Sequence, residues 1–177
     1  MSYDIFVYTS NLSDRVEDVK NPFTGEVTSQ PVGESVTDEE RLAILGIIDP
    51  VKEFGPDEIG AYGVKLSDGS SIELFFDGLD EVGKFCFGML ALDQFAIEIA
   101  EFVFQLAEAG HLVIQVGPEG GYVALSDEIA DRVGGRWEDV IVIKSAEELF
   151  ELIQSPFEEW AGFRDRVEDS FDDGGEF

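Results

Sequence analysis

The sequence predicts an α+β fold: a mixed or antiparallel sheet of about six strands packed on a long, central apolar helix, with further helices at the C-terminus. Alternating apolar and polar residues over 61–66 and 72–76, joined by an Asp-Gly turn, predict a hairpin with one covered face. An apolar run over 89–109, interrupted by one narrow polar stripe, predicts the long helix. Strands and helices alternate only in the second half of the chain, which favours α+β over a parallel α/β fold.

The first half of the chain contains one clear strand and one clear helix. β-branched and aromatic residues over 3–8 predict the strand. Residues 10–36 are polar and irregular, so we expect a long loop that could hold one short hairpin. Thr37 and Glu40 have the spacing of a capping box, which predicts a helix that ends near residue 48.

The second half is expected to alternate strands and helices. Gly110 is expected to end the long helix, and Ser126 and Ser145 to cap the helices that follow them. Four β-branched residues over 140–143 predict a strand buried on both faces. The Ser-Pro pair at 155–156 predicts that the last helix restarts there.

The length of 177 residues suits one domain, which we place at 1–168, followed by an acidic, mobile tail at 169–177. Intrinsic disorder is not expected, because 44% of the chain is hydrophobic and 15 residues are Phe. The N-terminal sequence lacks the features of a signal peptide, so we expect a cytoplasmic protein. We expect no membrane partner, because the most apolar run contains four acidic residues.

Charge is the most unusual property of the chain. It has 39 acidic and 11 basic residues, which gives a formal charge of -28 at pH 7. Nucleic acid repels such a surface, so we expect none as a partner. A basic protein is the partner that this charge favours.

The sequence provides little for enzymatic or cofactor chemistry. One cysteine and one histidine exclude a disulfide and the usual zinc ligand sets. Cys86 lies between two phenylalanines, where we expect it to be buried and inert, and His111 is expected to bond the end of the preceding helix. The glycine clusters lack phosphate-binding signatures. We therefore expect no catalytic residue, metal or cofactor.

We expect a non-enzymatic interaction protein that binds and masks a basic protein partner, as an immunity protein, an inhibitor or a mimic of nucleic acid charge would do. Residues 145–177 carry 11 acidic and two basic residues with aromatic residues between them, the composition of an acidic rim around aromatic anchors. The expected binding residues are Glu158, Glu159, Trp160, Asp165, Glu168, Asp169, Asp172 and Asp173. The alternative for this segment is an ordinary amphipathic helix whose aromatic residues face the core.

Two other functional classes stay open at this point. The charge could be a whole-surface adaptation of an ordinary domain to high salt, which the small number of lysines favours. A small enzyme that uses carboxylates alone or with a hard metal is the third hypothesis. It requires a cleft containing two acids of raised pKa, and no spacing in the chain selects a particular pair.

Overall fold

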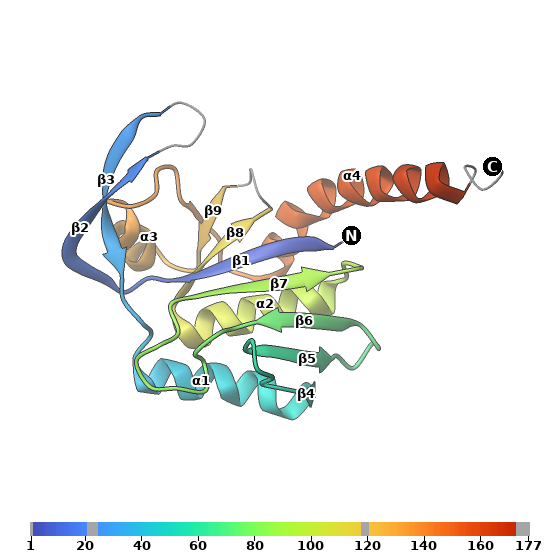
Figure 1. Ribbon diagram of the computed structural model, residues 1–177, viewed down its shortest axis with the longest axis horizontal. Coiled ribbons are helices and arrows are strands. Elements are labelled where there is room, and N and C mark those ends of the chain that lie inside the picture. Colours follow the sequence, from blue (N-terminus) through green and yellow to red (C-terminus); the bar gives the residue numbers. More distant parts are fainter. Residues whose placement is uncertain (1, 21–24, 118–120, 173–177) are drawn as a thin grey trace.

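The computed structural model describes residues 2–20, 25–117 and 121–172 (Figure 1). Its helices are α1 (Asp38–Ile48), the short 3₁₀ helix η1 (Asp49–Val51), α2 (Ile97–Gly110), α3 (Asp127–Val133) and α4 (Ala146–Asp172). Its strands are β1 (Tyr3–Thr9), β2 (Leu12–Lys20), β3 (Val27–Gly33), β4 (Lys52–Phe54), β5 (Ala61–Lys65), β6 (Ser71–Phe75), β7 (Phe87–Leu92), β8 (Leu112–Val116), β9 (Tyr122–Ala124) and β10 (Ile141–Val142).

The centre of the protein is a mixed sheet, which confirms the predicted α+β class, but the sheet has eight strands rather than about six. The strand order is β10-β9-β8-β1-β7-β6-β5-β4, and among the described strands only the β9–β10 pair is parallel. The first strand of the chain lies in the middle, between β7 and β8. Both edge strands are short, with three residues in β4 and two in β10.

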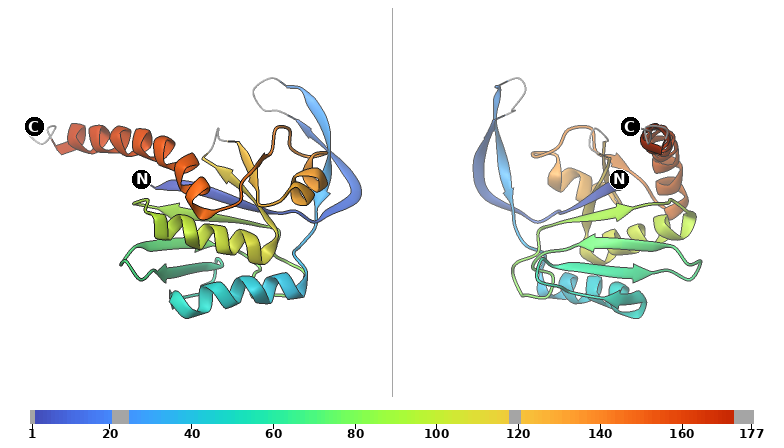
Figure 2. Two further views of the ribbon diagram at one scale, coloured as in Figure 1. Left: turned by 180° about the vertical axis from the view of Figure 1, so that it is seen from behind. Right: turned by 45° about the vertical axis from the view of Figure 1, so that its right-hand side comes forward.

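One face of the sheet is covered by helices. The buried residues of β1 alternate with half-buried ones, as a strand with one covered face requires. Ile5 and Leu90 in the sheet belong to the same buried cluster as Ile44 of α1, Val103 of α2 and Leu149 of α4. Figure 2 shows α2 along the back of the sheet and α1 near the β4 edge.

The opposite face is covered only in part. A second buried cluster lies there, made of Val113, Ala124, Ile129, Val133 and Trp137, and it joins α3 to β8 and β9. No described helix lies over the other half of this face, which β1, β7, β6, β5 and β4 form and which faces the viewer in Figure 1.

The prediction of a helix over 89–109 is wrong in its first part. Residues Phe87–Leu92 form strand β7, and the helix begins at Ile97. Met, Leu and Ala are good helix formers, but β7 is paired on both sides, with β1 and β6. These tertiary pairs outweigh local helix propensity, and a short apolar run does not distinguish the two structures.

The end of α2 also differs from the expectation. His111, not Gly110, adopts the left-handed conformation, with φ of 48°. Gly110 instead packs closely against its neighbours. A Cβ there would lie 2.6 Å from Ile44 Cδ1 and 2.9 Å from Leu112 Cγ, so these buried side chains would have to shift.

The last two predicted elements need correction as well. Pro156 does not restart a helix but lies inside α4, where packing on both sides of it outweighs its cost of about 3 kcal/mol. The strand expected to be buried on both faces is the edge strand β10, and Ile141 is exposed. Helix α4 continues to Asp172, so part of the expected tail is helical, and residues 173–177 lie outside the described residues.

The region expected to be a long loop contains a two-stranded arm. Strands β2 and β3 pair with each other and project from the main sheet (Figure 2). The capping box at Thr37 and Glu40 is confirmed, as is the Ser126 cap of α3. Within the described residues, no helix is both long enough and apolar enough to cross a membrane.

Candidate functional site

The uncovered half of the sheet presents aromatic and acidic side chains to solvent, and we call it the open face. Its large apolar side chains come from four strands, β1, β4, β6 and β7, and three carboxylates accompany them. The open face includes Phe6, Phe54, Phe75, Phe87, Met89, Asp4, Glu73 and Asp93, and the register also places one basic residue on it, the exposed Lys65 opposite Ser71. Phe54 is 50% exposed and Phe87 44% exposed, so large apolar surfaces meet water here.

Strand register arranges these side chains in rows. Phe6 pairs with Met89, and Met89 pairs with Phe75, so one row across three strands is apolar. The adjacent row contains Asp4, Ala91 and Glu73. An apolar row therefore lies directly beside an acidic one.

The aromatic surface continues from the open face toward the covered half. The Phe6 and Phe87 rings stack with centroids 6.0 Å apart, and Tyr8 lies 5.1 Å from Phe87. Tyr8 also lies 5.2 Å from the buried Trp137, which anchors this run to α3. These contacts hold the exposed rings in place before any partner arrives, which reduces the entropy lost on binding.

The predicted binding residue Trp160 is packed against the body of the protein. Its ring lies 5.8 Å from Tyr3 and 5.3 Å from Phe157, and the Arg164 guanidinium lies 4.9 Å above it. Trp160 thus contributes to fixing α4 to the sheet, whereas Phe163 of the same helix is exposed.

The acidic residues of α4 are arranged differently. Glu158, Glu159 and Asp165 are exposed, and Asp165 pairs with Arg164 at 2.9 Å. Arg164 also donates a hydrogen bond to the Asp93 carbonyl oxygen at 3.1 Å, which joins α4 to the border of the open face. Of the remaining predicted residues, Glu168, Asp169 and Asp172 belong to the last turns of α4, and Asp173 lies outside the described residues.

A second polar cluster surrounds the buried Glu40. Its Oε2 accepts hydrogen bonds from the Thr37 N–H at 2.8 Å and the Asn11 amide at 3.0 Å, and its Oε1 lies 2.8 Å from His111 Nδ1. Burial raises the pKa of Glu40, but the hydrogen bonds from Thr37, His111 and Asn11 together hold that pKa below its usual value. The cluster ties the start of the arm to α1 and α2.

The Glu40 cluster has features of a catalytic dyad but lacks a nucleophile among the groups around it. His111 opens onto a groove of about 390 Å³ that Ser126 and Arg132 also line. The Ser126 hydroxyl caps α3 by accepting the Ile129 N–H, and Arg132 pairs with Glu128 at 3.0 Å. We therefore assign the cluster a structural role. Cys86, which we expected to be buried, is exposed.

Among the described residues, the other carboxyl groups with a displaced pKa also shift downward. Hydrogen bonds from the Ser70 side chain and N–H lower the pKa of Asp68, and a hydrogen bond from its own N–H lowers that of Glu147. A general acid needs a raised pKa, so these shifts do not favour the carboxylate enzyme. No group of three or more His, Cys, Asp or Glu suited to a metal occurs in the part of the chain that the structure describes.

Comparisons with protein-family models, with curated proteins and with solved structures find no match to this chain. The open face itself was missed at the sequence level. Alternation of apolar and polar residues showed that the strand over 72–76 has two different faces. Both faces of β7 are apolar, so the sequence pattern did not reveal which face of the sheet the helices cover. The exposed pair Phe54 and Phe87 was not recognisable without the strand register.

Proposed function

We propose that this chain binds a basic protein and masks its positive charge, with the open face as the centre of the contact. The observation that carries the proposal is the side-by-side placement of the apolar row and the acidic row on an uncovered sheet. Exposed aromatic rings provide the anchors of an interface, and adjacent charges provide specificity and a fast association rate.

The overall charge supports the same proposal. Five of the 11 basic residues form ion pairs with acidic residues among the described side chains: Arg41, Lys52, Arg132, Lys144 and Arg164. In these pairs the positive charge of the basic side chain is already balanced by a carboxylate of the same chain. The remaining negative field attracts a basic protein over about one Debye length, roughly 8 Å at physiological salt.

The size of the open face indicates that it needs a rim. Five strands about 4.8 Å apart and about five residues along each strand give a projected patch of roughly 19 by 17 Å. A typical interface buries about 800 Å² on each partner, more than this patch offers. We propose that the exposed acids of α4, Glu158, Glu159 and Asp165, form part of that rim. We also propose that Glu168, Asp169, Asp172 and Asp173 contribute charge to binding.

The test is retention of basic proteins from a lysate of the source organism on three immobilised baits. These are the wild type, Phe87→Lys on the open face and Leu42→Lys on α1. Phe87 is 44% and Leu42 55% exposed, and both substitutions change the charge equally. We expect the wild type and Leu42→Lys to retain a basic protein that elutes with rising salt, and Phe87→Lys to lose about tenfold or more of it.

Equal retention by all three baits would show that the open face is not the contact. Retention of nothing by folded wild type would remove the proposal. In that case a melting temperature that continues to climb up to molar salt would favour salt adaptation, because screening is mostly complete well below that concentration.

A further inference from the structure

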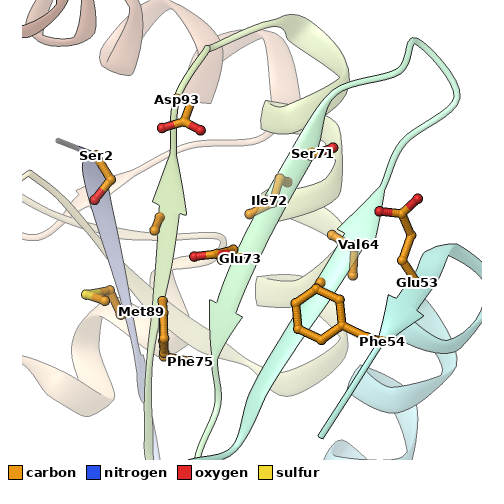
Figure 3. Close-up of a pocket in the computed structure, with 12 residues that line it drawn as sticks. Ser2, Glu53, Phe54, Val64, Ser71, Ile72, Glu73, Phe75, Met89 and Asp93 are labelled. Atoms are coloured by element: carbon orange, nitrogen blue, oxygen red, sulfur yellow. The ribbon is translucent and has the colours of Figure 1, made fainter. Parts of the chain in front are cut away.

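The open face contains a shallow recess between β7 and β4 (Figure 3). Its volume is about 390 Å³. The side chains that give it its character are three apolar and three acidic, namely Phe54, Phe75, Met89, Glu53, Glu73 and Asp93. None of the described residues that line it is a Lys, Arg or His.

Glu73 stands in this recess between two small residues. Its partner on β5 is Gly63 and its partner on β7 is Ala91, so neither cross-strand neighbour has more than a methyl group. In Figure 3 the Glu73 side chain extends toward β7. Space is therefore left on the Ala91 side of the carboxylate for a group from another molecule.

An aromatic ring borders the recess on the other side of Glu73, over β5. Phe54 comes from the edge strand β4 and its ring covers Gly63, where even a single Cβ would collide with it. Because Gly63 is also the neighbour of Glu73, the ring and the carboxylate are on adjacent positions of the sheet. Phe54 is half exposed, so part of the ring surface remains free to stack.

A carboxylate beside an exposed aromatic ring matches the guanidinium group of arginine better than the ammonium group of lysine. Guanidinium is planar, stacks on aromatic rings and pairs with a carboxylate through two parallel hydrogen bonds. Ammonium is a compact, strongly hydrated charge that gains less from a ring.

We propose that the anchor of the basic partner is an arginine side chain that enters this recess, pairs with Glu73 and stacks on Phe54. This proposal rests on the proposed function and specifies its chemistry. Asp93 and Glu53 at the ends of the recess supply further negative charge toward the entering side chain.

The test uses capped hexa-arginine and hexa-lysine peptides, whose charges are equal. Their affinities are measured by calorimetry at physiological salt for the wild type, Glu73→Gln, Phe54→Ala and the control Glu101→Gln. Glu101 is exposed on α2, on the other side of the sheet, so this control removes the same charge outside the recess. Amide NMR shifts of Gly63 and Ala91 in the wild type locate the bound peptide.

We expect hexa-arginine to bind the wild type about tenfold more tightly than hexa-lysine and to shift both amides. Glu73→Gln and Phe54→Ala should each remove most of that preference. Glu101→Gln should change both affinities about twofold or less, because only the long-range field changes.

If Glu73→Gln and Glu101→Gln lose equal affinity for the peptides, only net charge attracts the peptides. That result would overturn the recess as the arginine site. Equal affinities of the two peptides for the wild type would overturn the choice of arginine. Neither result affects the proposed function, which fails only if Phe87→Lys leaves retention of the natural partner unchanged or if no basic protein is retained. A partner lost from Phe87→Lys but kept by Glu73→Gln would reject the recess alone.

Discussion

Replacement of Glu40 by alanine should destabilise the protein strongly. Glu40 is buried, and its carboxylate accepts hydrogen bonds from the Thr37 N–H and the Asn11 amide and contacts His111. A hydrogen bond to a charged group contributes about 1.5–3 kcal/mol. Loss of the bonds from the Thr37 N–H and the Asn11 amide, two of the three donors to Oε2, should alone cost about 3 kcal/mol. At about 2–4 °C per kcal/mol for a chain of this size, the melting temperature should fall by about 6–12 °C.

The assay is urea denaturation followed by circular dichroism, with Glu39→Ala as the matched control. Glu39 is exposed in the same first turn of α1. Glu39→Ala should therefore lower the free energy of unfolding by about 1 kcal/mol or less. The expected pH dependence follows from the lowered pKa of Glu40. The carboxylate stabilises the fold above its unfolded pKa of about 4.3, and this contribution is lost as the pH falls through the lower folded value.

The stability difference between the wild type and Glu40→Gln should therefore be largest near neutral pH and shrink below about pH 4. Two results would refute this reasoning. One is a loss in Glu40→Ala no greater than that in Glu39→Ala. The other is a difference between wild type and Glu40→Gln that grows as the pH is lowered.

Two further predictions concern the core. Leu149→Ala should lower the free energy of unfolding, measured by urea denaturation, by about 2–5 kcal/mol, because Leu149 is fully buried where α4 meets the body. Leu152 is exposed, so Leu152→Ala should lower it by about 1 kcal/mol or less. Similar losses in the two variants would contradict the packing of α4. Tyr62→Phe should leave stability unchanged or raised at neutral pH, because the Tyr62 hydroxyl is buried without a hydrogen-bond partner among the described residues. Burial raises the pKa of Tyr62 to about 12, so the wild type should lose stability relative to Tyr62→Phe as the pH rises from about 10, where the unfolded tyrosine ionises. In an absorbance titration, Tyr62→Phe should lose one tyrosine that titrates near pH 12. If the variant and the wild type show the same titration there, that assignment is wrong.

The features that the sequence predicted correctly are those that depend on neighbouring residues. The Thr37–Glu40 capping box and the Asp-Gly hairpin turn are complete within a few residues, and each has one favourable geometry. Strand β7 and the continuous helix through Pro156 depend on contacts with distant segments. For that reason local propensity gave the wrong answer for both.

The candidate site was harder to predict than the fold. Phe6, Phe54, Phe75 and Met89 are far apart in sequence, and each looks like an ordinary core residue when considered alone. They become a surface only because α3 covers part of one sheet face and leaves the rest uncovered. The acid-rich C-terminal segment gives a clearer pattern in the sequence, because its charges and aromatic residues lie close together in the chain.

The very short edge strands have a consequence for how recognition could change over evolution. With three residues in β4 and two in β10, either edge of the main sheet offers another strand few backbone hydrogen bonds. A partner of the proposed kind would meet the sheet through side chains that project from a rigid backbone. A single substitution on the open face could then alter the choice of partner while every strand keeps its register. Such a surface can diversify rapidly, whereas one that binds through its backbone must preserve a whole strand to change at all.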